Sequence, residues 1–274
     1  MSGSGFRMAS NLAMVTIALC LVALPAATAE TLRIGGTGAA TELMKRLGSA
    51  FQATEADVKV EVIAGLGSSG AIAAAMDNVL DIAVSARPLK PAESGLTEMI
   101  AARTPFGLVS SNSAPGNIAG KDVAAFFASA TSTWPDGSAV RVILRPKSES
   151  DTALLGATFP GMTDAIEQVR NRIDVPLAAT DQDNLRMAAA IKGSLVGTSL
   201  VQMVTEHHHL QFLTIDGAEP TLENLQSGEY PYSKPFRFVF PANPAPLVER
   251  FMAFVASDDG ESLLREAGCL PGAQ

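Results

Sequence analysis

Hydrophobic residues near the start of the chain alternate between stretches typical of strands and of helices. Short apolar runs predict strands over residues 31–35 and 81–85, and the alternating valines of residues 58–62 predict a third. Apolar side chains at helical spacing predict a helix over residues 41–51, and an Ala-rich run predicts another over residues 70–79. This repeated order of strand, loop and helix is typical of a parallel α/β sheet.

The rest of the chain continues the alternation without a repeat of fixed period. Further strands are predicted at residues 104–111, 139–144, 193–198, 211–215 and 236–240, and further helices at residues 121–129, 163–172, 184–191, 246–256 and 261–266.

The first 29 residues have the three parts of a secretory signal peptide. Arg7 supplies the positive charge, residues 12–24 form the apolar stretch, and residues 27–29 (Ala-Thr-Ala) match the A-x-A cleavage site. The apolar stretch is shorter than a membrane-spanning helix requires. We therefore expect an exported protein whose mature chain begins at Glu30.

The chain has two cysteines, Cys20 and Cys269. Cys20 is a poor candidate for a lipid anchor because the bulky Leu19 precedes it. Removal of the signal peptide leaves Cys269 without a disulfide partner, so the mature protein must be held together by its hydrophobic core.

The chain is acidic, with 28 Asp and Glu against 20 Lys and Arg. Such a surface does not attract nucleic acid or anionic lipid. An anionic ligand would have to be bound by local dipoles and an Arg, against the overall field.

Three turns rich in Gly, Ser and Thr follow the first three predicted strands, at residues 35–41, 65–70 and 85–87. Each offers backbone N–H groups and hydroxyls at the start of a helix or after a strand, where partial positive charge favours an anion. Residues 65–70 also match G-x-G-x-x-G, but the acidic residue of a dinucleotide site is missing about 20 positions later. The pattern leaves open an oxyanion site or a structural tight turn.

A fourth polar loop begins with Arg145, at the end of a predicted strand, and continues with Ser148, Ser150 and Thr152. The Arg guanidinium is suited to bidentate binding of an oxyanion, although a solvated loop Arg fits the sequence equally well. Arg87 is interpreted as the partner of a surface carboxylate.

Catalysis is not indicated. Residues 207–209 are three adjacent His, whose side chains do not converge on a metal, and no Cys or carboxylate is spaced to complete a site. No G-x-S-x-G motif is present. We expect no catalytic residue, no metal and no cofactor, and we interpret the three His as a surface turn.

Several segments resemble periplasmic phosphate-binding proteins of ABC transporters. The matching segments follow the family's order over nearly all of the mature chain: residues 36–41, 65–70, 81–89, 122–134, 214–217 with 220–221, and 228–235. The resemblance implies a two-lobed type II periplasmic-binding-protein fold, with mixed sheets flanked by helices and two crossings between lobes. We expect lobe one at residues 30–112 plus 205–274 and lobe two at residues 113–204.

The resemblance also implies a set of ligand-binding positions contributed by all four polar loops. These are Gly38, Ala40, Thr41, Ser68, Ser69, Ser85, Arg145, Ser150, Asp151 and Thr152.

Two of these positions depart from the family. Ala40 stands where a hydroxyl residue is usual, so Thr41 is expected to take that role. Ala86 stands where the family often has an Asp that accepts the proton of hydrogen phosphate, and Asp151 replaces a Gly and offers an acceptor from the other lobe. These departures bear on the discrimination between phosphate and sulfate.

The expected function is capture of phosphate, or a similar tetrahedral oxyanion, in the periplasm for delivery to an ABC permease by a monomer that binds no nucleic acid. Three alternatives remain open: a binder of sulfate, molybdate or an organic anion, a ligand-sensing or protein-interaction module of the same fold, and a periplasmic phosphatase. The phosphatase is disfavoured because no nucleophile and base are paired in the sequence.

Overall fold

The computed structural model describes Met1, residues 29–55 and residues 57–272. The predicted signal peptide, Cys20 included, lies outside the described residues except for its two end residues. No helix in the described part of the chain has both the length and the apolar character to cross a membrane.

A mixed sheet of nine strands forms the centre of the molecule, in the order β2-β1-β3-β10-β4-β7-β6, with β8 and β11 also paired to β4. A separate pair joins β5 and β9. The strands are β1 (Glu30–Gly36), β2 (Val58–Ile63), β3 (Ile82–Ser85), β4 (Leu96–Ser110), β5 (Asn117–Ile118), β6 (Arg141–Val142), β7 (Ser194–Ser199), β8 (Gln211–Phe212), β9 (Thr214–Ile215), β10 (Ser233–Pro241) and β11 (Leu270–Pro271).

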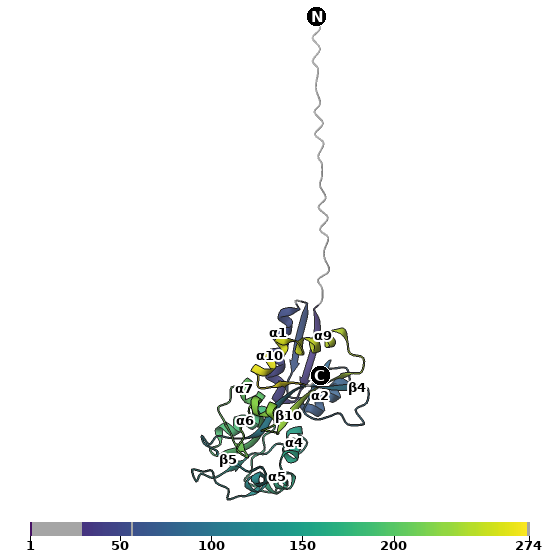
Figure 1. Ribbon diagram of the computed structural model, residues 1–274. Helices are drawn as coiled ribbons and strands as arrows, with labels where there is room; N and C mark the ends of the chain where they lie inside the picture. Colours follow the sequence, from purple (N-terminus) through teal and green to yellow (C-terminus); the bar gives the residue numbers. More distant parts are fainter. Residues whose placement is uncertain (2–28, 56, 273–274) are drawn as a thin grey trace.

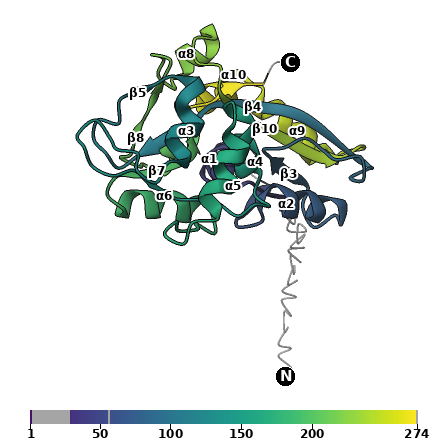
Figure 2. The same cartoon turned by 90° about the horizontal axis from the view of Figure 1, so that it is seen from below.

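Helices cover both faces of this sheet (Figures 1 and 2). They are α1 (Thr41–Thr54), α2 (Gly67–Met76), α3 (Val123–Ala128), α4 (Ser150–Thr158), α5 (Met162–Arg170), α6 (Asp181–Ala190), α7 (Leu200–Thr205), α8 (Leu222–Ser227), α9 (Pro246–Val255) and α10 (Asp258–Glu266), with 3₁₀ turns η1 (Gly38–Ala40) and η2 (Gly120–Asp122).

The first three strands confirm the parallel arrangement predicted from the sequence. β1 pairs in parallel with both β2 and β3, and α1 and α2 connect them. β10 then joins β3 in the antiparallel direction, which makes the sheet mixed.

The buried apolar residues form separate cores along the sheet. The first core packs α1, α9 and α10 on one face, around Phe51, Phe238 and Phe251, while α2 covers the other face. The second core packs α3, α4 and α5 around Phe106 and Trp134. Figure 1 shows the two groups of helices at opposite ends of the ribbon.

β4 is the longest strand and differs from its prediction, which began only at residue 104. It starts at Leu96, and its first half pairs with β10 whereas its second half pairs with β7. The first half was missed because the charged residues Glu98, half-buried, and Arg103, exposed, interrupt its apolar pattern. β4 thereby runs from the first core into the second.

Candidate functional site

The four polar loops meet where the two cores adjoin. The Ser68 and Ser150 hydroxyl oxygens lie 3.2 Å apart although the residues are 82 positions apart in the chain. At the first turn, Gln182 donates from its side-chain amide to the carbonyl of Gly38 over 3.1 Å. The loops therefore share one interior region rather than lying on separate faces.

The starts of several helices contribute to this region. α2 begins at Gly67. The Ser68 hydroxyl, near the start of α2, accepts a hydrogen bond from the N–H of Ala86 over 3.0 Å, which joins the polar turn at residues 65–70 to the one at residues 85–87. Gly65 and Gly67 have φ of +82° and +63°, a conformation that glycine adopts without strain. α4 begins at Ser150, directly opposite Ser68.

Arg145 lies inside this region with only 8% of its surface exposed. Its Nη1 donates to the carbonyl of Ala178 over 3.3 Å, and its Nη2 lies 3.2 Å from a carboxylate oxygen of Glu149 and 3.7 Å from one of Asp181. Its Nε is buried and has no hydrogen-bond partner in the structure. A buried guanidinium with a spare donor is suited to an oxyanion guest.

A second buried cation, Lys234 at the start of β10, stands beside it. Lys234 is fully buried, and its Nζ bonds a carboxylate oxygen of Asp151 at 2.5 Å. Asp151 is 8% exposed and belongs to the first turn of α4. This ion pair therefore joins α4, which packs in the second core, to β10, which packs in the first core.

Asp181, the first residue of α6, completes the charged cluster and is 7% exposed. Burial, reinforced by the nearby charge of Asp151, raises the pKa of this carboxyl to about 6, while Lys234 and Arg145 oppose the rise. A Cβ placed on Gly38 would come within 2.5 Å of Asp181 Oδ2, so a larger residue at that point of the first turn would force the Asp181 side chain to move.

The titration of Asp181 should be visible in the pH dependence of stability. Because the pKa of Asp181 is raised from 3.8 to about 6 on folding, folding favours its protonated form. The resulting stability is complete below pH 4 and is lost as the pH rises through 6, by about 2–3 kcal/mol. In urea unfolding, the free energy of unfolding of Asp181→Asn should fall less over this pH range than that of the wild type. Asp183→Asn changes a half-buried residue on the same helix and should show the same fall as the wild type.

The predicted ligand-binding residues divide into three groups. The side chains of Ser68, Arg145, Ser150 and Asp151 lie within the cluster described above. Gly38, Ala40 and Thr41 are buried in the first turn and the start of α1, where Ala40 supplies no hydroxyl.

The other predicted hydroxyls already have partners elsewhere. Ser69 accepts a hydrogen bond from the side chain of Arg87 over 3.1 Å, and the buried Ser85 donates to the carbonyl of Arg87 over 2.7 Å. Thr152 donates to the carbonyl of Pro146 over 2.9 Å. These three stay predictions as ligand donors. Ser69 only accepts from Arg87, so its own O–H can still donate to a ligand, whereas the Ser85 and Thr152 hydroxyls would have to be released.

Arg87 pairs with a carboxylate, as the sequence predicted. Its two Nη atoms bond the two carboxylate oxygens of Glu93 at 2.9 and 2.6 Å. The hydrogen bond from Arg87 lowers the pKa of Glu93 to about 2. Of the three adjacent His, His207 lies in the turn after α7, with a φ of +57°, and His208 and His209 follow it in irregular structure.

Sequence reasoning missed Asp181, Lys234 and Glu149. Lys234 carried a usable signal, because it shares the inward face of β10 with Phe236, Phe238 and Phe240 at alternate positions. A Lys at such a position must be buried, and a buried Lys needs an anionic partner. Asp181 carried no signal beyond that of an acidic residue at a helix start.

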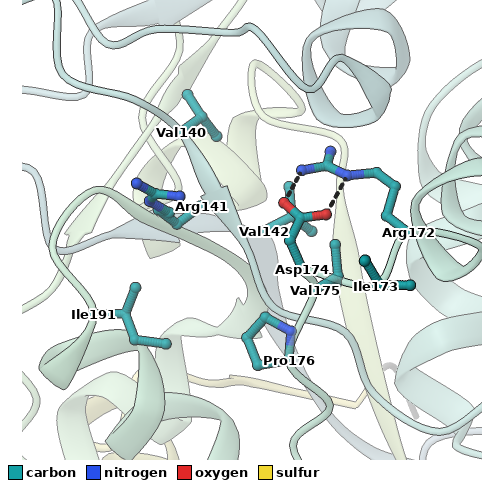
Figure 3. Close-up of a pocket in the computed structure, with 9 residues that line it drawn as sticks. All are labelled: Val140, Arg141, Val142, Arg172, Ile173, Asp174, Val175, Pro176 and Ile191. Carbon is teal, nitrogen blue, oxygen red and sulfur yellow. Dashed lines mark hydrogen bonds and ion pairs between the residues drawn. The ribbon is translucent and has the colours of Figure 1, made fainter.

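An open hollow lies elsewhere, on the outside of the second core (Figure 3). It has a volume of about 370 Å³ and is bordered by β6 and by the segment from Arg172 to Pro176. Arg172 and Asp174, both from that segment, form an ion pair at 2.7 Å beside it, as Figure 3 shows. Two of the three charged side chains that line it, Arg172 and Asp174, neutralise each other, so this hollow is a weaker candidate than the buried cluster.

Comparison with known proteins places the fold. A family model described as "PBP superfamily domain" matches residues 22–259. No curated protein sequence matches the chain.

Solved structures match along almost the whole chain. A phosphate-bound protein of Clostridium perfringens, assigned as the substrate-binding protein of a phosphate ABC transporter, has a TM-score of 0.77 and 18% identity, covering 89% of this chain and all of that one. An ABC-type phosphate transport receptor of Vibrio cholerae has a TM-score of 0.63 and 18% identity, covering 87% of this chain and 99% of that one. Reduced OxyR of Neisseria meningitidis has a TM-score of 0.62 and 10% identity, covering 89% and 99%.

These matches confirm the predicted fold class, a type II periplasmic-binding-protein-like arrangement of a mixed sheet flanked by helices. They also confirm the resemblance drawn from the motifs. At these identities the solved structures establish the fold alone.

Proposed function

Because the chain belongs to the PBP superfamily, we propose that it is an exported solute-binding protein that captures phosphate or a similar tetrahedral oxyanion for an ABC permease. The observation that carries the proposal is Arg145, a buried guanidinium with an unpartnered Nε, whose ion-pair partner Glu149 directly precedes Ser150, the residue that faces Ser68. The signal peptide read from residues 1–29 supports a periplasmic location.

The proposed site takes donors from both sides of the junction. Ser68 and the first-turn N–H groups come from the first core, and Arg145 and Ser150 come from the second. Micromolar binding requires about −8 kcal/mol. Several hydrogen bonds to a charged guest, at roughly 1.5–3 kcal/mol each, suffice for that affinity.

We propose that lobe one comprises residues 30–105 and 233–272 and that lobe two comprises residues 106–232. Ala102 packs in the first core whereas Phe106 packs in the second, and Tyr230 packs in the second whereas Phe236 packs in the first. The chain thus changes cores within β4 and before β10, and between these points Val201 of α7 also packs in the first core. These limits differ from the sequence-based ones, which put residues 106–112 and 205–232 in lobe one.

Ser68→Ala tests the contribution of lobe one. The change should weaken phosphate binding about tenfold, because it removes one hydrogen bond to a charged ligand. Isothermal titration calorimetry with phosphate, sulfate and molybdate measures the effect and ranks the anions. Ser132→Ala, which removes a hydroxyl bonded to Phe126 outside the cluster, is the control and should bind as the wild type does. Equal affinities for the two variants would remove Ser68 from the site.

We also propose that the protein binds its ligand without reaction. Within the described residues no group of three or more His, Cys, Asp and Glu side chains is placed to hold a metal ion. Cys269 is buried, and its burial raises the pKa of the thiol far above the ordinary value, which opposes a nucleophilic role. Turnover of a chromogenic phosphate ester would overturn this part of the proposal.

A further inference from the structure

The carboxylate of Asp181 lies where the proposed ligand donors converge. Its Oδ1 is 3.7 Å from Arg145 Nη2, and its Oδ2 lies against the first turn, within 2.5 Å of where a Cβ on Gly38 would stand. Arg145 and the first turn are the two anion-binding elements of the proposed site. A protein carboxylate therefore already faces both of them.

We propose that Asp181 competes with the ligand for this site, and that the oxyanion binds together with one proton taken up by the Asp181 carboxylate. This inference rests on the proposed function. It makes Asp181 a specificity-determining residue, because the need for a proton on its carboxylate limits which charge states of the site can combine with which charge states of the ligand.

The charges around Asp181 support the coupling of ligand binding to proton uptake. Arg145 and Glu149 face it from the loop before α4, Asp151 faces it from α4, and Lys234 faces it from β10. Two cations are thus opposed by three carboxylates before any ligand enters. An added anion would raise the excess of negative charge in a buried region, and protonation of one carboxylate offsets it.

Asp181 is the carboxylate placed to take that proton. Asp151 is held by Lys234 at 2.5 Å, and Glu149 is partly exposed and lies 3.2 Å from Arg145. Asp181 has only the longer contact to Arg145, and its pKa is raised to about 6 by burial. Once protonated, it changes from a competing acceptor into an O–H donor toward the ligand.

The balance of this step is simple. One proton passes from solvent to a carboxylate oxygen of Asp181, no covalent bond of the ligand breaks, and nothing is oxidised or reduced. Ligand release returns the proton to solvent.

The test measures phosphate binding to the full mature protein by calorimetry between pH 6 and pH 8, for the wild type, Asp181→Asn and Asp183→Asn. Apparent affinity scales with the fraction of protein in which Asp181 is protonated, and this fraction falls from about one half at pH 6 to about one hundredth at pH 8. The ratio of the wild-type dissociation constant to that of Asp181→Asn should therefore rise about fiftyfold. The titration of phosphate itself cancels in this ratio.

Asp183→Asn is the matched control, since Asp183 lies on the same helix and pairs with Arg186 instead of the cluster. It should follow the wild type at every pH. Repeating the wild-type titration at pH 8 in buffers of different ionisation enthalpy counts protons without a variant. We expect about one more proton taken up by the wild type than by Asp181→Asn.

The outcomes separate the two proposals. A ratio that stays constant with pH, no additional proton uptake by the wild type, or Asp181→Asn binding more weakly than the wild type throughout would overturn the role of Asp181 and leave the binding function standing. Absence of phosphate binding by the wild type and both variants at every pH would overturn both.

Discussion

Arg145→Ala is expected to weaken phosphate binding at least a hundredfold. Arg145 is the buried cation with a spare donor in the proposed site, and a fork of two charge-assisted hydrogen bonds is worth roughly 3–6 kcal/mol. Titration calorimetry measures the loss, and circular dichroism checks that the variant is folded.

Two further variants make this experiment specific. Arg145→Lys keeps the charge but removes the planar fork, so it should recover only part of the affinity. Arg172→Ala removes an Arg that is paired with Asp174 at the outer hollow and should bind as the wild type does. A wild-type affinity for Arg145→Ala would show that the anion binds elsewhere.

The elements at the start of the fold were predictable because their signals are local. The alternating valines of β2 and the helical spacing of apolar residues in α1 reflect which face of each element is buried. β4 was predicted too short, because its first half is stabilised by pairing with β10, more than a hundred residues later. Its own sequence does not record that partner.

The candidate site was predictable to a smaller extent. Glycine and hydroxyl residues in a turn before a helix indicate an anion site wherever they occur, and this signal identified the turns at Ser68 and Ser150. That the two hydroxyls face each other depends on how distant segments pack, which no local pattern contains. Asp181 was missed for the same reason, because an Asp at a helix start is usually a favourable contact with the helix dipole.

The ion pair of Lys234 and Asp151 should have the largest effect on stability. Lys234→Met leaves the Asp151 carboxylate buried without its closest cation, and breaking such a pair costs about 3–5 kcal/mol. Urea unfolding should show the loss as a lower midpoint. Lys59→Met, which breaks an exposed pair with Glu61, should cost less than about 1 kcal/mol.

A double variant separates the loss of the pair from the loss of packing. Replacing both partners, with Lys234→Met and Asp151→Asn together, removes the uncompensated charge and should recover more than half of the lost stability. If the double variant is no more stable than Lys234→Met alone, then the apolar stem of Lys234, which lies along the inward face of β10 beside Phe236, contributes more than its charge. The cluster would then be held together chiefly by packing, and the pairing of its charges would serve the ligand rather than the fold.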